Sequence, residues 1–308
     1  MEPVYHIPAL LEPTVSGMLT RPDGVYADLT FGGGGHSRAI LSRLNDKGRL
    51  FSFDRDMDAY ANANELTDDQ RWQFVHSDFR YLAQFMDYYG VDSLDGILAD
   101  LGVSFHHFDT AERGFSFRFA GPLDMRMNRS GGKTAADIVN RYTEEELARV
   151  LYIYGELKQS RPLARRLVQA RSSQPIERTE QLVTVLTGGK DDPGLLSPAQ
   201  KKELTLVFQA LRIEVNDELG ALRTMLQSAT DLLRQGGRIA ILTYHSLEDR
   251  LVKNFFKSGN LDGRVEKDFY GNLLTPFRLI EKGLTADDDE VARNARARSA
   301  KLRIAEKR

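Results

Sequence analysis

The chain of 308 residues has no cysteine, one tryptophan and no apolar run near eighteen residues. The absence of cysteine excludes disulfide bonds, thiolate nucleophiles, iron–sulfur ligation and cysteine-bound zinc. The polar N-terminal segment and the lack of long apolar runs predict neither a secretory signal nor a membrane span, so we expect a cytoplasmic protein. The net charge is only −2, which excludes a polycation that coats nucleic acid along its whole length.

What is present is enough apolar material, 41% of the residues, for at least one buried core. Strands and helices alternate in the N-terminal third, where residues 37–45 have helical spacing of apolar side chains. The expected strands cover residues 24–29, 49–54, 72–77 and 93–100. The connections between them are too long for hairpins, so they predict βαβ crossovers, a parallel sheet and an α/β fold.

This alternation stops after Gly102. Helical patterns then dominate to about residue 207, at 144–155, 162–172 and 178–186. A long helix, continuous or broken, is expected over 198–233, followed by a strand at 238–244 and an antiparallel pair at 277–281 and 300–305. We therefore expect a core formed by residues 1–108 and 208–308, interrupted by a helical insertion at 109–207 that recognises the substrate.

Basic side chains concentrate in two zones of the sequence. They are Arg161, Arg165, Arg166 and Arg171 in the insertion, and Arg293, Arg296, Arg298, Lys301 and Arg303 in the C-terminal tail. Such clusters suit phosphate backbones, because each neutralised phosphate releases counterions. Solvated helix faces and termini are the alternative explanation.

Glycines 32–35 directly follow the first expected strand, so the backbone can approach a ligand closely there. Asp54 closes the second strand 22 positions after Gly32, near the spacing at which a carboxylate meets ribose hydroxyls. The dinucleotide fingerprint fails, because Ser37 and Arg38 stand where Gly or Ala is needed, and there is no triphosphate-binding loop. A nucleoside ligand without a pyrophosphate remains, and S-adenosylmethionine is the common one.

Two further residues are candidates for this site. Phe79 follows the third strand and would lie beside adenine, or would pack a helix. Asp100 ends an apolar strand, where a carboxylate is costly unless it is paired. His106 and His107 are adjacent, but no further ligand has the spacing of a metal site, so we expect no metal.

Several stretches together resemble the RsmH (MraW) family of bacterial methyltransferases. They are residues 5–11 (YHIPALL), 30–37 (TFGGGGHS), 100–104 (DLGVS), 112–117 (ERGFSF), 121–127 (GPLDMRM), 245–250 (HSLEDR) and 296–303 (RARSAKLR). The resemblance extends over essentially the whole chain. It implies N4-methylation of a cytidine in the decoding region (P site) of 16S ribosomal RNA in the small subunit, with S-adenosyl-L-methionine as the methyl donor.

The resemblance also implies a class I, Rossmann-like methyltransferase sheet with an inserted helical domain. Carried over position by position, the donor contacts fall on Gly34, Gly35, His36, Asp54, Phe79, Asp100 and His107. The chain departs from the family pattern at Phe105-His106, where the family usually has Ser-Pro. It also departs at Asn294-Ala295, where the family usually has Asn-Pro.

Methyl transfer to an exocyclic amine needs a group that accepts hydrogen bonds from the amine and receives its proton. Asp100 is the candidate for this catalytic role, and the alternative is that the ammonium group of the donor occupies the same carboxylate. Ser246 and Asp249 fit a capping box for a helix over 247–257, which leaves His245 and Arg250 as candidates for the target base or its phosphate. A purely structural role for this segment is the alternative. Arg113, with Phe115 and Phe117, interleaves a cation with aromatic rings that suit stacking on an unpaired base. Ordinary packing within the domain is the alternative explanation for the aromatic rings.

Arg165 and Arg166, together with Arg296 and Arg298 of the tail, would bind phosphates. Two other functions stay open. One is a nicotinamide-dependent oxidoreductase on a similar sheet, which the failed fingerprint argues against. The other is a non-catalytic ribosome-assembly factor that binds the donor only as a stabiliser. The sequence leaves the choice between a monomer and a homodimer open.

Overall fold

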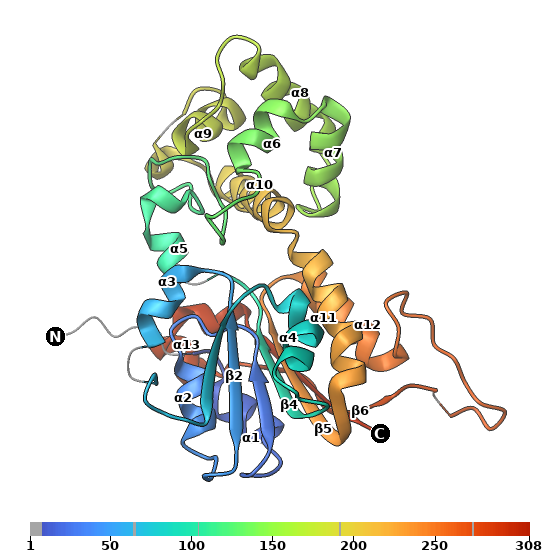
Figure 1. Cartoon of the computed structure of the whole chain (residues 1–308). Coiled ribbons are helices and arrows are strands. Elements are labelled where there is room, and N and C mark those ends of the chain that lie inside the picture. The colour runs from blue at the N-terminus through green and yellow to red at the C-terminus, as the bar shows by residue number, and fades with distance from the viewer. Residues whose placement is uncertain (1–7, 64–65, 104, 191, 273) are drawn as a thin grey trace. The chain divides into compact units, whose positions relative to one another are not determined.

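The computed structural model describes residues 8–308 except 64–65, 104, 191 and 273 (Figure 1). The chain forms two compact units. The first contains Met1–Gly102 and Leu219–Arg308, and the second contains Val103–Glu218. The second unit thus extends beyond the expected insertion at both ends. No helix in the described part of the chain is long and apolar enough to cross a membrane.

The first unit is built on a seven-stranded sheet with the order β3-β2-β1-β4-β5-β7-β6. Its strands are β1 (Val25–Asp28), β2 (Arg49–Asp54), β3 (Trp72–His76), β4 (Leu94–Asp100), β5 (Leu233–Thr243), β6 (Phe277–Thr285) and β7 (Lys301–Lys307). Strands β1 to β5 pair in parallel, whereas β7 runs antiparallel to both β5 and β6. The expected α/β class, the parallel strands and the antiparallel pair are confirmed.

Alternating side chains of the strands enter two separate cores, because successive residues of a strand point to opposite faces. One face, with Phe53 and Ile97, packs against α4 (Leu82–Tyr88), α11 (Glu218–Leu232) and α12 (Ser246–Ser258). The other, with Tyr26 and Leu242, packs against α1 (Leu11–Met18) and α2 (Gly35–Leu41). Shorter elements complete the unit: α3 (Met57–Tyr60), η1 (Ala61–Ala63), η2 (Phe79–Tyr81), α13 (Asp288–Arg293) and η5 (Ala295–Ser299).

The second unit is helical and has its own core, which includes Leu147, Leu163 and Leu211. Its elements are α5 (Phe105–Asp109), η3 (Ala111–Arg113), α6 (Ala135–Arg141), α7 (Glu144–Ile153), α8 (Ser160–Arg171), α9 (Thr179–Thr187), η4 (Pro193–Leu195) and α10 (Pro198–Asn216). Capping boxes at Thr134, Thr143 and Ser197 fix where α6, α7 and α10 begin. The helix expected over 198–233 is broken at Asp217, whose φ of 45° is left-handed.

Candidate functional site

Three carboxylates lie at one edge of the sheet in the first unit. Asp28, Asp54 and Asp100 are the last residues of β1, β2 and β4, which are neighbours in the order β2-β1-β4. Parallel strands end on the same side, so their C-terminal residues converge there. Ligands of open α/β sheets bind outside these ends. The edge therefore contains two of the residues that the sequence singled out, Asp54 and Asp100.

The glycine loop after β1 is bonded to Asp54. The Gly32 amide donates to Oδ2 of Asp54 at 2.8 Å, and the Asp56 amide donates to Oδ1 at 2.9 Å. Gly32 has a left-handed φ of 51°, and a Cβ built there would meet nothing within 4 Å. Burial raises the pKa of Asp54, against the two amide bonds. Gly32 is thus a residue with open space beside a carboxylate that the backbone orients.

Gly34 and Gly35 are glycines for a different reason. A Cβ on Gly34 would lie 2.8 Å from the Phe31 ring, and one on Gly35 would lie 2.3 Å from Pro8. A side chain at either position would therefore collide with a neighbouring side chain. Of Gly32, Gly34 and Gly35, Gly32 has open space where a side chain would stand.

Two side chains that the sequence analysis missed brace this loop. Arg38 donates from Nη1 to the Gly33 carbonyl at 2.7 Å, and Asn62 donates from Nδ2 to the Gly32 carbonyl at 3.0 Å. Arg38 Nη2 also donates to the Asn62 carbonyl at 3.1 Å. The contact of Arg38 could have been predicted from the sequence, because Arg38 lies one helical turn after Gly34. The contact of Asn62 could not, because only the tertiary fold brings Asn62 close to the Gly32 carbonyl.

Asp28 is buried in a network of hydroxyl groups. Ser37 Oγ lies 2.6 Å from Asp28 Oδ2 and 2.7 Å from Ser52 Oγ, and Trp72 Nε1 donates to Ser52 at 2.9 Å. Burial raises the pKa of Asp28 to about 6, although the Ser37 and Thr30 donors oppose it. This network holds the start of α2 against the sheet, so Ser37 acts as a structural residue there.

Asp100 is the third carboxylate at this edge, and its surroundings shift its pKa toward neutrality. Its amide donates to Thr30 Oγ1 at 2.7 Å, and its side chain is 22% exposed. Burial, together with Asp28 and Glu248, raises the pKa of Asp100 to about 7, and a hydrogen bond from Tyr244 opposes this. A carboxylate with a pKa near neutrality can exchange a proton at physiological pH.

His36 is the neighbour of Asp100 on α2. Its Nδ1 lies 3.8 Å from Oδ2 of Asp100, and burial lowers the pKa of the imidazole to about 4. His36 is therefore neutral at physiological pH and leaves the charge of Asp100 uncompensated. Its Nε2 is buried without a hydrogen-bond partner among the described residues. This nitrogen, on the same ring as the one that faces Asp100, is a position where a bound molecule would find a polar contact.

Phe79 begins η2 at the end of β3 and is partly buried against the sheet core. Asp78 fixes this turn, because its carboxylate accepts from the Arg80 amide at 2.9 Å and from Arg55 at 3.0 Å. The ring of Phe79 packs against the sheet core and also lies just after β3. Contact with adenine and a packing role therefore both remain possible interpretations of Phe79.

The expected base-stacking group of the second unit is buried there. Arg113 is 2% exposed and donates to the carbonyls of Arg126 and Met127 at 3.1 Å. Phe115 is 4% exposed and stacks on His107, with ring centroids 4.8 Å apart. Phe117 meets Phe208 edge to face at 5.7 Å. Both side chains lie in the core of the unit, which favours a packing role over stacking on an unpaired base.

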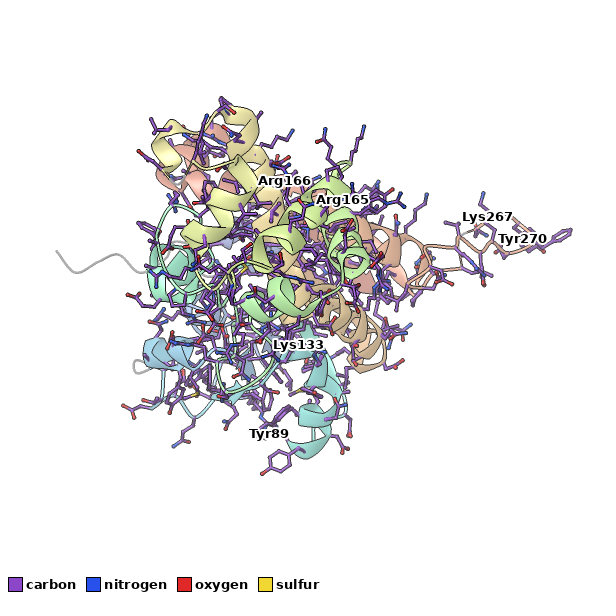
Figure 2. All side chains as sticks on the ribbon, turned by 90° about the horizontal axis from the view of Figure 1, so that it is seen from above. Tyr89, Lys133, Arg165, Arg166, Lys267 and Tyr270 are labelled. Carbon is purple, nitrogen blue, oxygen red and sulfur yellow. The ribbon has the colours of Figure 1, made fainter. Side chains whose placement is uncertain are left out.

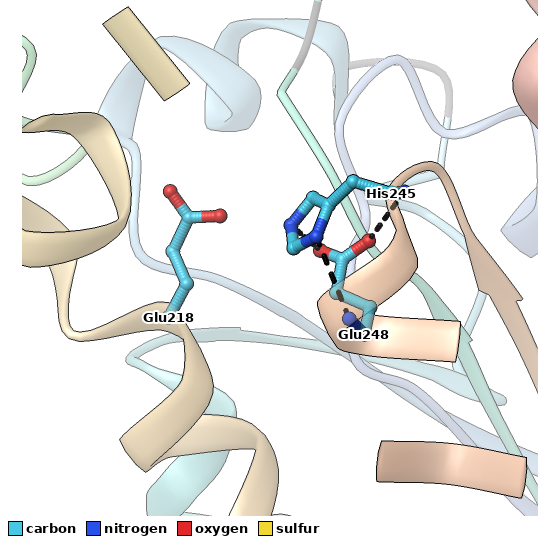
Figure 3. A group of neighbouring side chains, drawn as sticks. All are labelled: Glu218, His245 and Glu248. Carbon is cyan, nitrogen blue, oxygen red and sulfur yellow. Dashed lines mark hydrogen bonds and ion pairs between the residues drawn. The ribbon is translucent and has the colours of Figure 1, made fainter. Parts of the chain in front are cut away.

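The N-terminus of α12 also corrects a prediction. The N-cap is His245 and not Ser246, and the capping box pairs His245 with Glu248 in place of Asp249 (Figure 3). His245 Nδ1 accepts from the Glu248 amide at 3.5 Å, and its Nε2 lies 3.1 Å from Glu248 Oε1. Asp249 instead accepts from Arg303 of β7 at 2.7 Å. His245 thus has a structural role, and Arg250 lies exposed one turn further along.

The exposed cations of the second unit include Arg165 and Arg166 on α8, both visible in Figure 2. Arg165 Nε lies 3.4 Å from Glu144, and Arg166 donates to the Leu186 carbonyl at 2.9 Å. Arg171 donates to the Val139 carbonyl at 2.6 Å. In the tail Arg298 is exposed, whereas the side chain of Arg296 lies outside the described part of the chain.

Comparison with known proteins decides the family. The MraW methylase family model matches residues 3–308. The chain belongs to the MraW methylase family. The ribosomal RNA small subunit methyltransferase H of Bacteroides fragilis (strain YCH46) is 56% identical over 308 residues, which cover 100% of this chain and 99% of the relative. The enzyme of the same name from Parabacteroides distasonis is 57% identical over 307 residues, covering 98% and 97% of the two chains.

Membership of a methylase family confirms the resemblance and bears out S-adenosyl-L-methionine as the cofactor. It argues against the oxidoreductase alternative. The residues of the first unit fit this donor: Gly32 offers open space, Asp54 offers an oriented carboxylate and His36 offers an orphaned nitrogen. These groups lie on the loop after β1, at the end of β2 and on α2.

Proposed function

We propose that this protein transfers a methyl group from S-adenosyl-L-methionine to N4 of a cytidine in the decoding region of 16S ribosomal RNA, within the small ribosomal subunit. The family and the names of the relatives support methylation of small-subunit ribosomal RNA. The observation that carries the chemistry is the pair of carboxylates at the ends of β2 and β4, the two strands that flank β1. Asp54 is bonded to the glycine loop, and Asp100 has a pKa near neutrality.

Asp54 is the residue that would hold the ribose of the donor. Its two oxygens already accept from backbone amides, and each carboxylate oxygen has a second acceptor site for a hydroxyl group. Gly32 lets the backbone approach the donor, and Phe79 provides an apolar surface for adenine. The donor carries most of the reactivity, so the protein accelerates the reaction mainly by aligning the donor with the target amine.

Asp100 is the residue that would act on the amine. The nitrogen lone pair of cytosine N4 is delocalised into the ring, so the amine must be turned by a hydrogen-bond acceptor before it attacks. When bound, the donor supplies a methyl group whose bond to sulfur breaks, with the electron pair kept by sulfur, as the bond to N4 forms. Asp100 then takes the proton that the nitrogen must lose, and releases it to solvent.

Phosphate binding would come from exposed cations, with Arg165 and Arg166 on α8, Arg250 on α12, and Arg298 in the tail as candidates. The target base must leave any stack to reach the donor, which costs free energy that backbone contacts can offset. These contacts add affinity without reading the sequence, because phosphate groups are the same at every nucleotide.

The test is to incubate the protein with isotopically labelled donor and small ribosomal subunits, and to locate the label in the RNA. We expect one labelled cytidine in the decoding region, with the methyl group on N4, and no label with Asp100→Asn. Donor binding without any transfer by the unmodified protein would support the non-catalytic assembly factor. Label on another base would contradict the proposed specificity.

A further inference from the structure

Tyr244 has a contact that the sequence analysis did not foresee. Its hydroxyl group donates to Oδ1 of Asp100 at 2.7 Å. Tyr244 directly follows β5, whose Leu242 is in register with Asp100 of β4. Because side chains two residues apart in a strand share a face, Tyr244 lies on the face that Asp100 uses. The backbone of Tyr244 is fixed as well, since its amide donates to Glu248 Oε2 at 3.0 Å.

The space for this ring is created by a glycine. Gly102, two residues after Asp100, has a φ of 129°, and a Cβ there would lie 3.0 Å from the Tyr244 ring. A side chain at this position would press on the ring and move its hydroxyl group. The glycine in the DLGVS motif therefore permits the tyrosine to reach the carboxylate.

The bond to Tyr244 controls both rotation and charge at Asp100. A short hydrogen bond from a hydroxyl to a carboxylate is charge-assisted and directional. It occupies Oδ1 and leaves Oδ2 facing His36, which is neutral. The other charged groups that act on Asp100 are acids, Asp28 from β1 and Glu248 from α12. Tyr244 is thus the neighbour that favours the ionised carboxylate against burial and two acids.

We propose that Tyr244 is a positioning residue, which holds the carboxylate of Asp100 in the orientation and charge state that methyl transfer requires. This inference rests on the proposed function, because it assigns Tyr244 a role through Asp100. In this role Tyr244 acts through Asp100 and not directly on the donor or the RNA. Its contribution is exerted on the oxygen that receives the proton, since an ionised Asp100 is the form that can accept it.

The experiment compares the full chain with Tyr244→Phe, using single-turnover methyl transfer to small subunits over a range of pH at saturating donor. Loss of the hydroxyl group removes the bond to the ionised carboxylate, so the pKa of Asp100 rises. We expect the acidic limb of the pH–rate profile to move up by about one unit, which is a loss of roughly tenfold on that limb. At alkaline pH the rate should return to within a few-fold of the unmodified protein.

Tyr26→Phe is the matched control, because its hydroxyl group is also internally bonded, to the Arg21 carbonyl at 2.7 Å, and it lies in the same unit. Its profile should not shift. A uniform loss of rate for Tyr244→Phe at every pH would assign the ring a packing role and overturn the proposal. An unshifted profile would also overturn it.

Asp100→Asn separates failure of this inference from failure of the proposed function. If Asp100→Asn keeps full methyl transfer, the role of Asp100 is wrong, and with it the basis for Tyr244. If Asp100→Asn is inactive while Tyr244→Phe keeps the unmodified profile, only the inference about Tyr244 fails.

Discussion

Asp54 and Gly32 are joined by a hydrogen bond of 2.8 Å from the glycine amide to Oδ2 of the carboxylate. The bond links the end of β2 to the loop after β1, so it fixes the carboxylate and the glycine loop of the expected donor site relative to each other. It also explains the separation of the two residues in the sequence, since a βαβ unit of this length brings consecutive strand ends together.

Replacing Asp54 should weaken donor binding. In Asp54→Asn the single amide oxygen can accept from only one of the two backbone amides, and the charge-assisted bonds to ribose hydroxyls are lost. We expect the dissociation constant for S-adenosyl-L-methionine, measured by calorimetry, to rise by about ten- to a hundredfold. Asp46→Asn, at an exposed site, should leave it unchanged. An unaltered affinity in a folded Asp54→Asn would contradict the donor site.

Asp28 should make stability depend on pH. Its pKa is raised from 3.8 to about 6 by burial, so the folded protein binds this proton more tightly than the unfolded chain does. Stability from this group is therefore greatest at low pH and is lost as pH rises through about 6. Between pH 4.5 and 7.5 this loss should be about 2 kcal/mol.

Asp28→Asn removes that dependence, so the free energy of unfolding of the variant relative to the unmodified protein should rise across this range. Urea unfolding at several pH values measures the difference. Asp92→Asn, at an exposed position, should follow the unmodified protein at every pH. Parallel curves for Asp28→Asn would show that Asp28 titrates normally.

His245 should contribute to stability as a helix cap. His245→Ala removes the side-chain acceptor at the N-terminus of α12, and we expect a loss of about 1 kcal/mol in the free energy of unfolding. His245→Asn should retain most of the stability, because asparagine is a favoured cap. His76→Ala, at an exposed site, controls for loss of an imidazole. If His245→Asn is stable but cannot methylate RNA, His245 binds the target base or its phosphate, as the sequence suggested.

Arg165 and Arg166 should affect RNA binding but not donor binding. With both changed to glutamine, affinity for small-subunit RNA should fall at low salt, and the slope of log affinity against log salt should decrease by about one to two. The control replaces Arg141 and Lys190, two exposed cations of the same unit. Identical salt slopes for the two double variants would show that Arg165 and Arg166 do not belong to the RNA-binding surface.

Much of the first unit follows from local patterns. Asp54 and Asp100 were assigned to strand ends because a carboxylate closes each apolar run, and both lie at those ends. Ser246 was wrongly assigned as the cap of α12, because the choice between adjacent residues depends on where the backbone leaves β5. Arg113 and Phe115 have residue types that suit stacking on a base, but both side chains are buried in the core of the second unit. A motif of cations and aromatic rings does not reveal which side chains a core will bury.

The sequence by itself determined the α/β class, the helical interruption and the edge where the carboxylates meet, because periodicity and strand-ending residues are local properties. Only the tertiary structure decided that Tyr244 bonds Asp100, that Asn62 braces Gly32 and that His36 is buried and neutral. These relationships join residues distant in the chain, and the pKa of a group depends on its depth and neighbours. Both are set by packing, which no local pattern encodes.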